Sequence, residues 1–98
     1  MREIEICVSF SDCYGTKESD TITMCAEESW SESQLITWAS DLATDWFYSV
    51  AEEECSIIWK ERGGGSDSEY EYFLDRYLYS CDFNWSFKKK WNRKREEI

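Results

Sequence analysis

The sequence predicts an α+β fold, a single two-layer domain in which two helices pack on one face of a sheet. The sheet is expected to be antiparallel or mixed, with about four strands, and the element order is β-β-α-β-α-β. Three observations predict this class: an alternating apolar pattern near the N-terminus, a long amphipathic run at Ser31–Glu54, and a glycine break at Gly63–Gly65. A chain of 98 residues is long enough for one core.

Two strands are expected at the start of the chain. Glu3–Phe10 and Thr21–Ala26 both alternate between apolar and polar residues, which is typical of half-buried strands. The polar segment Ser11–Asp20 between them is predicted to be a turn or hairpin loop, so the strands are expected to pair antiparallel. The residues predicted to point inward are Ile4, Ile6, Val8, Phe10, Ile22, Met24 and Ala26.

The long run Ser31–Glu54 is predicted to be the central helix. Ser31 or Ser33 can cap its start, and Gln34 stands where the second partner of a capping box is found. The apolar face at helical spacing consists of Leu35, Trp38, Ala39, Leu42, Ala43, Trp46 and Val50. The opposite face gathers Asp41, Asp45, Tyr48 and Glu52.

After this helix, the apolar and β-branched segment Cys55–Glu61 predicts a third strand, and Arg62–Ser66 predicts a break. From Asp67 two patterns compete. A helical period over about twelve residues favours a helix, whereas a short alternation around Tyr70 and the preceding glycines would suit a hairpin. The helix is preferred because its period persists longer. Asp82–Phe87 alternates again and predicts the last strand.

The charge divides the chain into an acidic domain, 1–87, and a basic C-terminal tail, 88–98. The domain has nineteen acidic and five basic residues, a net charge of −14, while the tail has a net charge of +4. Such a domain is expected to repel nucleic acid and anionic membranes and to attract basic protein surfaces. A plainer interpretation is that the acids only support solubility.

Residue content argues against most catalytic chemistry, so no enzyme, cofactor or metal is predicted. The chain contains no histidine, which excludes His-based triads. Its five cysteines form no CxxC pair, so we expect no zinc and reduced, mostly buried thiols in a cytoplasmic protein. Carboxylate pairs are frequent enough to arise by chance, and the glycine run lacks the Lys-Ser/Thr of a phosphate loop. No segment has the length of a membrane span.

The candidate binding residues are acids and tyrosines on the two predicted helices: Asp41, Asp45, Tyr48, Glu52, Glu53, Glu54, Glu69 and Tyr72. Asp41 and Asp45 are four residues apart, a spacing at which like charges oppose each other. Glu52–Glu54 would lie at the end of the predicted helix, where the helix dipole disfavours anions. Acids at costly positions are consistent with selection for charge, although a solvated helix face is the ordinary alternative. The many aromatic residues would fill the core or prepare a binding surface.

In its size, its acidity, its single α+β domain and its lack of catalytic residues, the chain resembles small phage-borne inhibitors of bacterial defence, especially anti-CRISPR proteins and other DNA mimics. The resemblance is one of type and carries over no residue roles. It implies a non-enzymatic inhibitor in the cytoplasm of a bacterial host. Its partner would be a basic nucleic-acid-binding protein, a CRISPR-Cas effector or restriction nuclease whose DNA or RNA binding it blocks.

Two other functions stay open at this point. The chain could be an acidic protein–protein interaction module, or an immunity-type protein that masks a basic partner. Alternatively, the tail residues Lys88–Arg95, with Trp91 among them, could bind nucleic acid themselves. The inhibitor hypothesis predicts no direct DNA binding, no membrane association, and a monomer or small homo-oligomer.

Overall fold

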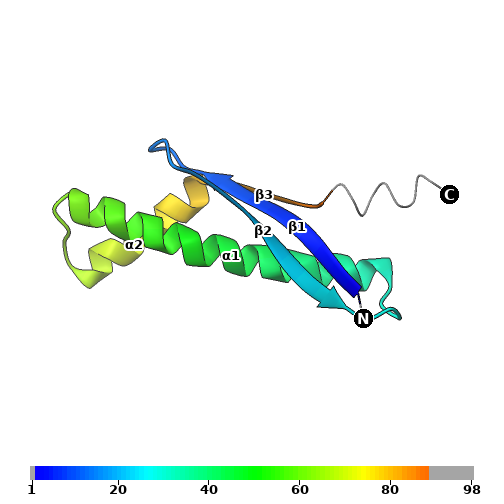
Figure 1. Ribbon diagram of the computed structural model, residues 1–98. Helices are drawn as coiled ribbons and strands as arrows, with labels where there is room; N and C mark the ends of the chain where they lie inside the picture. Colours follow the sequence, from blue (N-terminus) through cyan, green and yellow to red (C-terminus); the bar gives the residue numbers. More distant parts are fainter. Residues whose placement is uncertain (1, 89–98) are drawn as a thin grey trace.

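A computed structural model describes residues 2–88 as two helices and a three-stranded antiparallel sheet (Figure 1). The elements are β1 (Arg2–Ser11), β2 (Lys17–Ala26), α1 (Glu32–Glu61), α2 (Asp67–Ser80) and β3 (Asp82–Phe87). The strands lie in the order β2-β1-β3. The α+β class is therefore confirmed, while the predicted four strands and the order β-β-α-β-α-β are wrong. The basic tail predicted at 88–98 lies outside the described residues except for Lys88.

The sheet has one apolar face, as the alternation predicted. Ile6 pairs with Ile22 across β1 and β2, and Ile4 pairs with Met24. All four predicted inward residues of β1 are buried. Strand β3 pairs with the second half of β1, and its three aromatic rings are half-buried at alternate positions. This face binds α1, because burying its branched side chains removes apolar area from water.

The β1–β2 connection is shorter than predicted. The strands continue to Ser11 and resume at Lys17, so only residues 12–16 form the turn. The carboxylate of Asp12 accepts hydrogen bonds from the backbone N–H groups of Tyr14 at 2.9 Å and Thr16 at 2.7 Å, and Gly15 adopts a positive φ of 92°. Polar residues can continue a strand here because the ladder is made by the backbone, whatever the side-chain polarity.

Helix α1 begins as predicted and ends later. Ser31 caps it, and Ser31 and Gln34 form the expected capping box. The helix then continues through Cys55–Glu61, so the predicted third strand is wrong. The β-branched residues there disfavour a helix by only a few tenths of a kcal/mol each. Burial of Cys55 and half-burial of Ile58 against α2 outweigh that preference.

The buried positions of α1 recur at every fourth residue. Since each residue turns the helix by about 100°, each step of four moves the buried side by about 40°. The first half of the helix therefore faces the sheet and the second half faces α2. The buried residues of α1 are Leu35, Ala39, Ala43, Phe47, Ala51 and Cys55. Trp38, predicted to be on the apolar face, is instead 50% exposed, with its ring beside that of Trp30.

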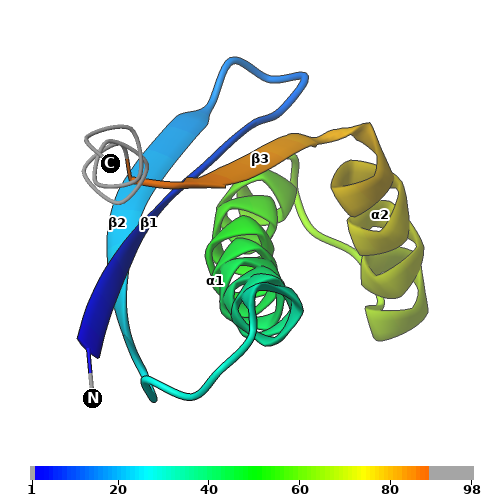
Figure 2. The same cartoon turned by 90° about the vertical axis from the view of Figure 1, so that its right-hand side faces the viewer.

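Helix α2 forms as preferred, with Ser66 and Glu69 in a second capping box, and the hairpin alternative is wrong. The helix packs on the second half of α1 rather than on the sheet, so α1 lies between the sheet and α2 (Figure 2). The prediction that both helices cover the sheet is therefore wrong for α2. Its one fully buried residue, Tyr77, joins Phe10 and Phe47 in a second apolar cluster.

Candidate functional site

One side of α1 carries a row of exposed acids, as the helical period predicted. Asp41, Asp45 and Glu52 are all exposed. Helix geometry places Asp45 about 6 Å along the axis from Asp41, and Glu52 about 10 Å further. Within the described part of the chain, none of the three has a basic side chain within ion-pair distance. We call these three residues the acidic row.

Two aromatic side chains flank the acidic row. Trp38 is 50% exposed and Tyr48 is 49% exposed, so each ring presents about half of its surface to solvent. Each ring lies tilted against another ring, Trp30 for Trp38 and Phe47 for Tyr48, both at 5.5 Å between centroids. The rings are thus partly held in place before any partner binds.

Glu53 and Glu54 do not belong to this row, because neighbouring residues on a helix point about 100° apart. Glu54 is half-buried, and burial together with the charge of Glu18 on β2 raises the pKa of its carboxyl group. Glu53 is exposed on another side of the helix. Since α1 continues to Glu61, these acids are also not at its C-terminus, and the predicted conflict with the helix dipole is wrong.

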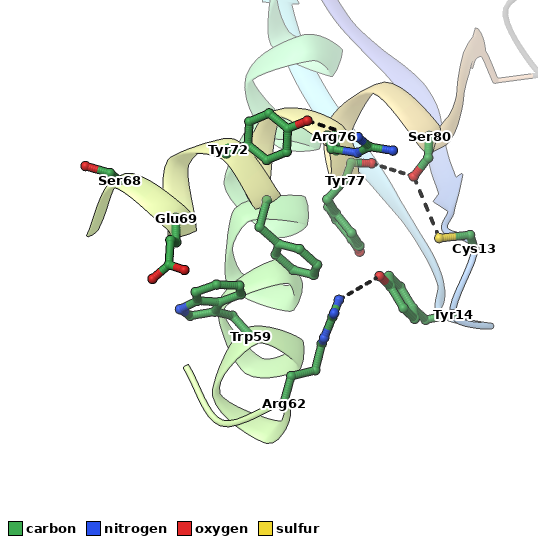
Figure 3. A pocket seen from close by; sticks show the side chains of 11 residues that line it. Cys13, Tyr14, Trp59, Arg62, Ser68, Glu69, Tyr72, Arg76, Tyr77 and Ser80 are labelled. Carbon is green, nitrogen blue, oxygen red and sulfur yellow. Dashed lines mark hydrogen bonds between the residues drawn. The ribbon is translucent and has the colours of Figure 1, made fainter. Parts of the chain in front are cut away.

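The two remaining predicted residues, Glu69 and Tyr72, lie elsewhere. They line a groove of about 680 Å³ between the end of α1, one side of α2 and the β1–β2 turn (Figure 3). The structure therefore divides the predicted site residues between the acidic row and this groove. The other groove residues that carry its chemistry are Tyr14, Trp59, Arg62, Phe73, Arg76 and Tyr77.

The two arginines of this groove were not among the binding residues predicted from the sequence. Arg62 was part of the predicted break, and Arg76 was one residue of a predicted helix. The available signal was their rarity, because only five basic residues precede Lys88. A second signal was the spacing of Tyr72 and Arg76, which places them side by side on a helix.

A partly buried hydrogen bond holds the turn against α2 beside the groove. The Tyr77 hydroxyl donates to Asp12 Oδ2 at 2.6 Å, and the Tyr14 ring stacks on Tyr77 at 6.3 Å between centroids. Burial opposes ionisation of Asp12, but its hydrogen bonds from Tyr77 and the turn backbone hold the pKa of its carboxyl group below the usual value. Burial, then the hydrogen bond to Asp12, raises the pKa of Tyr77.

The cysteines are free and only one is fully buried, which corrects the expectation of mostly buried thiols. Cys55 is buried, Cys7 and Cys81 are half-buried, and Cys13 and Cys25 are exposed. Burial raises the pKa of Cys81 to about 11 and also raises that of Cys55. These two groups therefore stay as thiols at neutral pH, which makes them poor nucleophiles.

No group of three or more Cys, Asp or Glu side chains among residues 2–88 is arranged to hold a metal ion. No helix in that range is both long and apolar enough to cross a membrane.

Comparisons of the chain with protein-family models, with curated proteins and with solved structures found no match.

Proposed function

We propose that this chain is a non-enzymatic inhibitor that binds a basic, nucleic-acid-handling protein of a bacterial defence system through the acidic row. The partner would be a CRISPR effector or a restriction nuclease in the bacterial cytoplasm. The observation that carries the proposal is the row itself, with Asp41, Asp45 and Glu52 exposed on one helix and without basic partners among residues 2–88.

The rigidity of α1 supports this role. Its 30 residues form one uninterrupted helix about 45 Å long, fixed on one side by the sheet and on another by α2. That length equals about thirteen base-pair steps of DNA. Carboxylates on such a helix keep their spacing without ordering a flexible segment. Each can then accept charge-assisted hydrogen bonds from arginines that otherwise bind phosphates.

The flanking rings supply what charge alone lacks. Contacts between exposed charges are screened by salt and contribute little net affinity. Half-exposed Trp38 and Tyr48 can lose their remaining hydration against a partner, and such aromatic residues dominate binding energy at many interfaces. The acids would set the register and the rings the affinity.

The test is a titration of the full chain into a panel of CRISPR effectors and restriction nucleases, with DNA binding and cleavage measured together. For one panel member the proposal expects both to be lost at near-stoichiometric protein, with weaker inhibition at high salt. Loss of cleavage with DNA still bound would contradict mimicry. No effect on any member would favour the acidic interaction module.

A further inference from the structure

The groove between α1, α2 and the β1–β2 turn combines cations and rings in a domain that is otherwise strongly acidic. Arg62 lies at the end of α1, and Arg76 lies near the end of α2. Figure 3 shows Arg62 beside Tyr14 and Arg76 between Tyr72 and Ser80, so the two guanidinium groups border the same hollow from different elements. The acidic row does not contribute to this groove.

Both arginines make their contacts with neutral groups. Arg62 Nη1 donates to the Tyr14 hydroxyl at 3.4 Å, and its guanidinium lies 4.9 Å from the centre of the Phe73 ring. Arg76 Nη1 donates to the Tyr72 hydroxyl at 3.1 Å. Among residues 2–88, no carboxylate lies within ion-pair distance of either group. Because each guanidinium has five N–H donors, most of this capacity is left for an anion.

Aromatic side chains form most of the rest of the groove, together with the polar residues Cys13, Ser68, Glu69 and Ser80. The Glu69 carboxylate accepts the backbone N–H of Ser66 at 2.9 Å. The Trp59 ring lies 5.1 Å from the Phe73 ring, and Tyr72 is 64% exposed at the rim. Aromatic faces of this kind stack on planar bases with little regard to sequence. A volume of about 680 Å³ lies in the range of small-molecule sites.

The surrounding backbone supports this arrangement before any ligand binds. A Cβ atom on Gly65 would lie 2.8 Å from a Trp59 ring carbon, so the glycine allows the close approach of this ring. On the opposite side, the hydrogen bond from Tyr77 to Asp12 ties the turn that carries Tyr14 to α2. A preformed groove of this kind loses little entropy when it binds.

We propose that this groove binds a small ligand of the nucleotide class, a planar base that carries a phosphate. The base stacks among the rings of Trp59, Tyr72 and Phe73, and the phosphate binds the guanidinium groups of Arg62 and Arg76. The proposal does not depend on the acidic row or on a nuclease partner.

The test is calorimetric titration of the full chain with each of the four ribonucleoside 5′-monophosphates, supported by tryptophan fluorescence. We expect at least one to bind, about tenfold or more tightly than its own nucleoside or inorganic phosphate. Arg62→Gln and Arg76→Gln should each lower the affinity for that nucleotide by about tenfold and leave the affinity for the nucleoside unchanged. If Arg62→Gln lowers thermal stability, the effect of Arg76→Gln alone tests whether the groove arginines bind the phosphate.

Lys60→Gln is the matched control, since it removes the same charge from the end of α1 at a residue that does not line the groove. It should leave binding unchanged. The proposal is overturned if no monophosphate binds, or if the control weakens binding as much as the groove variants. Phenyl phosphate binding as tightly as the best nucleotide would also overturn it, and would indicate a phosphorylated tyrosine peptide instead.

Discussion

At the scale of single residues, Asp12 connects its own turn to a helix far along the chain. Its two carboxylate oxygens bind both the backbone of its own turn and the hydroxyl of Tyr77, 65 residues further along. The sequence predicts the turn, because an aspartate followed by Gly15 is a local signal. The link to Tyr77 could not be predicted, since it depends on where α2 comes to lie.

Replacing Tyr77 with Phe should therefore destabilise the domain. We expect the free energy of unfolding at neutral pH to fall by about 1.5–3 kcal/mol, as for a hydrogen bond to a charged group. Urea denaturation measures this change. Tyr79→Phe is the control, because that side chain is 93% exposed on the same helix and its loss should have little effect.

The cost of Tyr77→Phe should also depend on pH. The pKa of Asp12 is held below 3.8 in the folded state, so its contribution is present above that value and is lost as the pH falls through the folded pKa. The difference in the free energy of unfolding between wild type and variant should thus become smaller in acid. It should narrow again above pH 10, because the raised pKa of Tyr77 favours the unfolded state there. A difference that stays constant across this range would contradict the assignment.

At the scale of elements, α1 shows both the power and the limit of sequence periodicity. The helix start, its capping box and the outward acids follow from local spacing, and the structure has all three. The error at Cys55–Glu61 came from β-branched residues, whose weak helix propensity is overridden by packing on α2. The buried side of α1 turns along the helix because its first half packs on the sheet and its second half on α2. The spacing of residues within α1 does not reveal the contact with α2.

The buried alanines of α1 predict a test of its packing. Ala39 is 0% exposed against the sheet, so Ala39→Leu should overpack this contact and destabilise the domain by about 1–3 kcal/mol. Thr37→Leu places the same side chain on an exposed position of the helix and should change stability by less than about 0.5 kcal/mol. Thermal or urea unfolding of both variants is the measurement. Equal effects would show that α1 does not pack on the sheet through Ala39.

Helix α2 provides a second element-scale test at its start. The Ser66 hydroxyl accepts the backbone N–H of Glu69 at 3.2 Å, so Ser66→Ala should cost about 0.5–2 kcal/mol of stability. Ser68→Ala, at the second residue of the same helix, is the control and should lower stability by less. Denaturant unfolding of both variants is the measurement. Equal losses of stability would contradict the capping role of Ser66.

At the scale of the whole molecule, the chain separates two kinds of surface. The acidic row lies along one exposed side of α1, while the arginine groove lies where the ends of α1 and α2 meet the β1–β2 turn. The first could be predicted because its members share one helix period. The second could not, because Tyr14, Trp59 and Arg76 come together only through tertiary packing. Charge and ring character predict Glu69 and Tyr72 as binding residues, and the structure places them in the groove.

The central claim is that the acids of α1 act through their position and not only through total charge. The most direct measurement compares two charge reversals in the nuclease inhibition assay, with DNA binding as the readout. Asp41→Lys with Asp45→Lys reverses two of the three charges of the acidic row. Glu71→Lys with Asp75→Lys makes the same change at the same spacing on exposed positions of α2.

We predict that the α1 pair weakens inhibition by about a hundredfold or more, because lysines would face the basic partner, while the α2 pair stays within a few-fold of wild type. Inhibition that survives the two charge reversals on α1, or that falls equally with both pairs, would contradict the account.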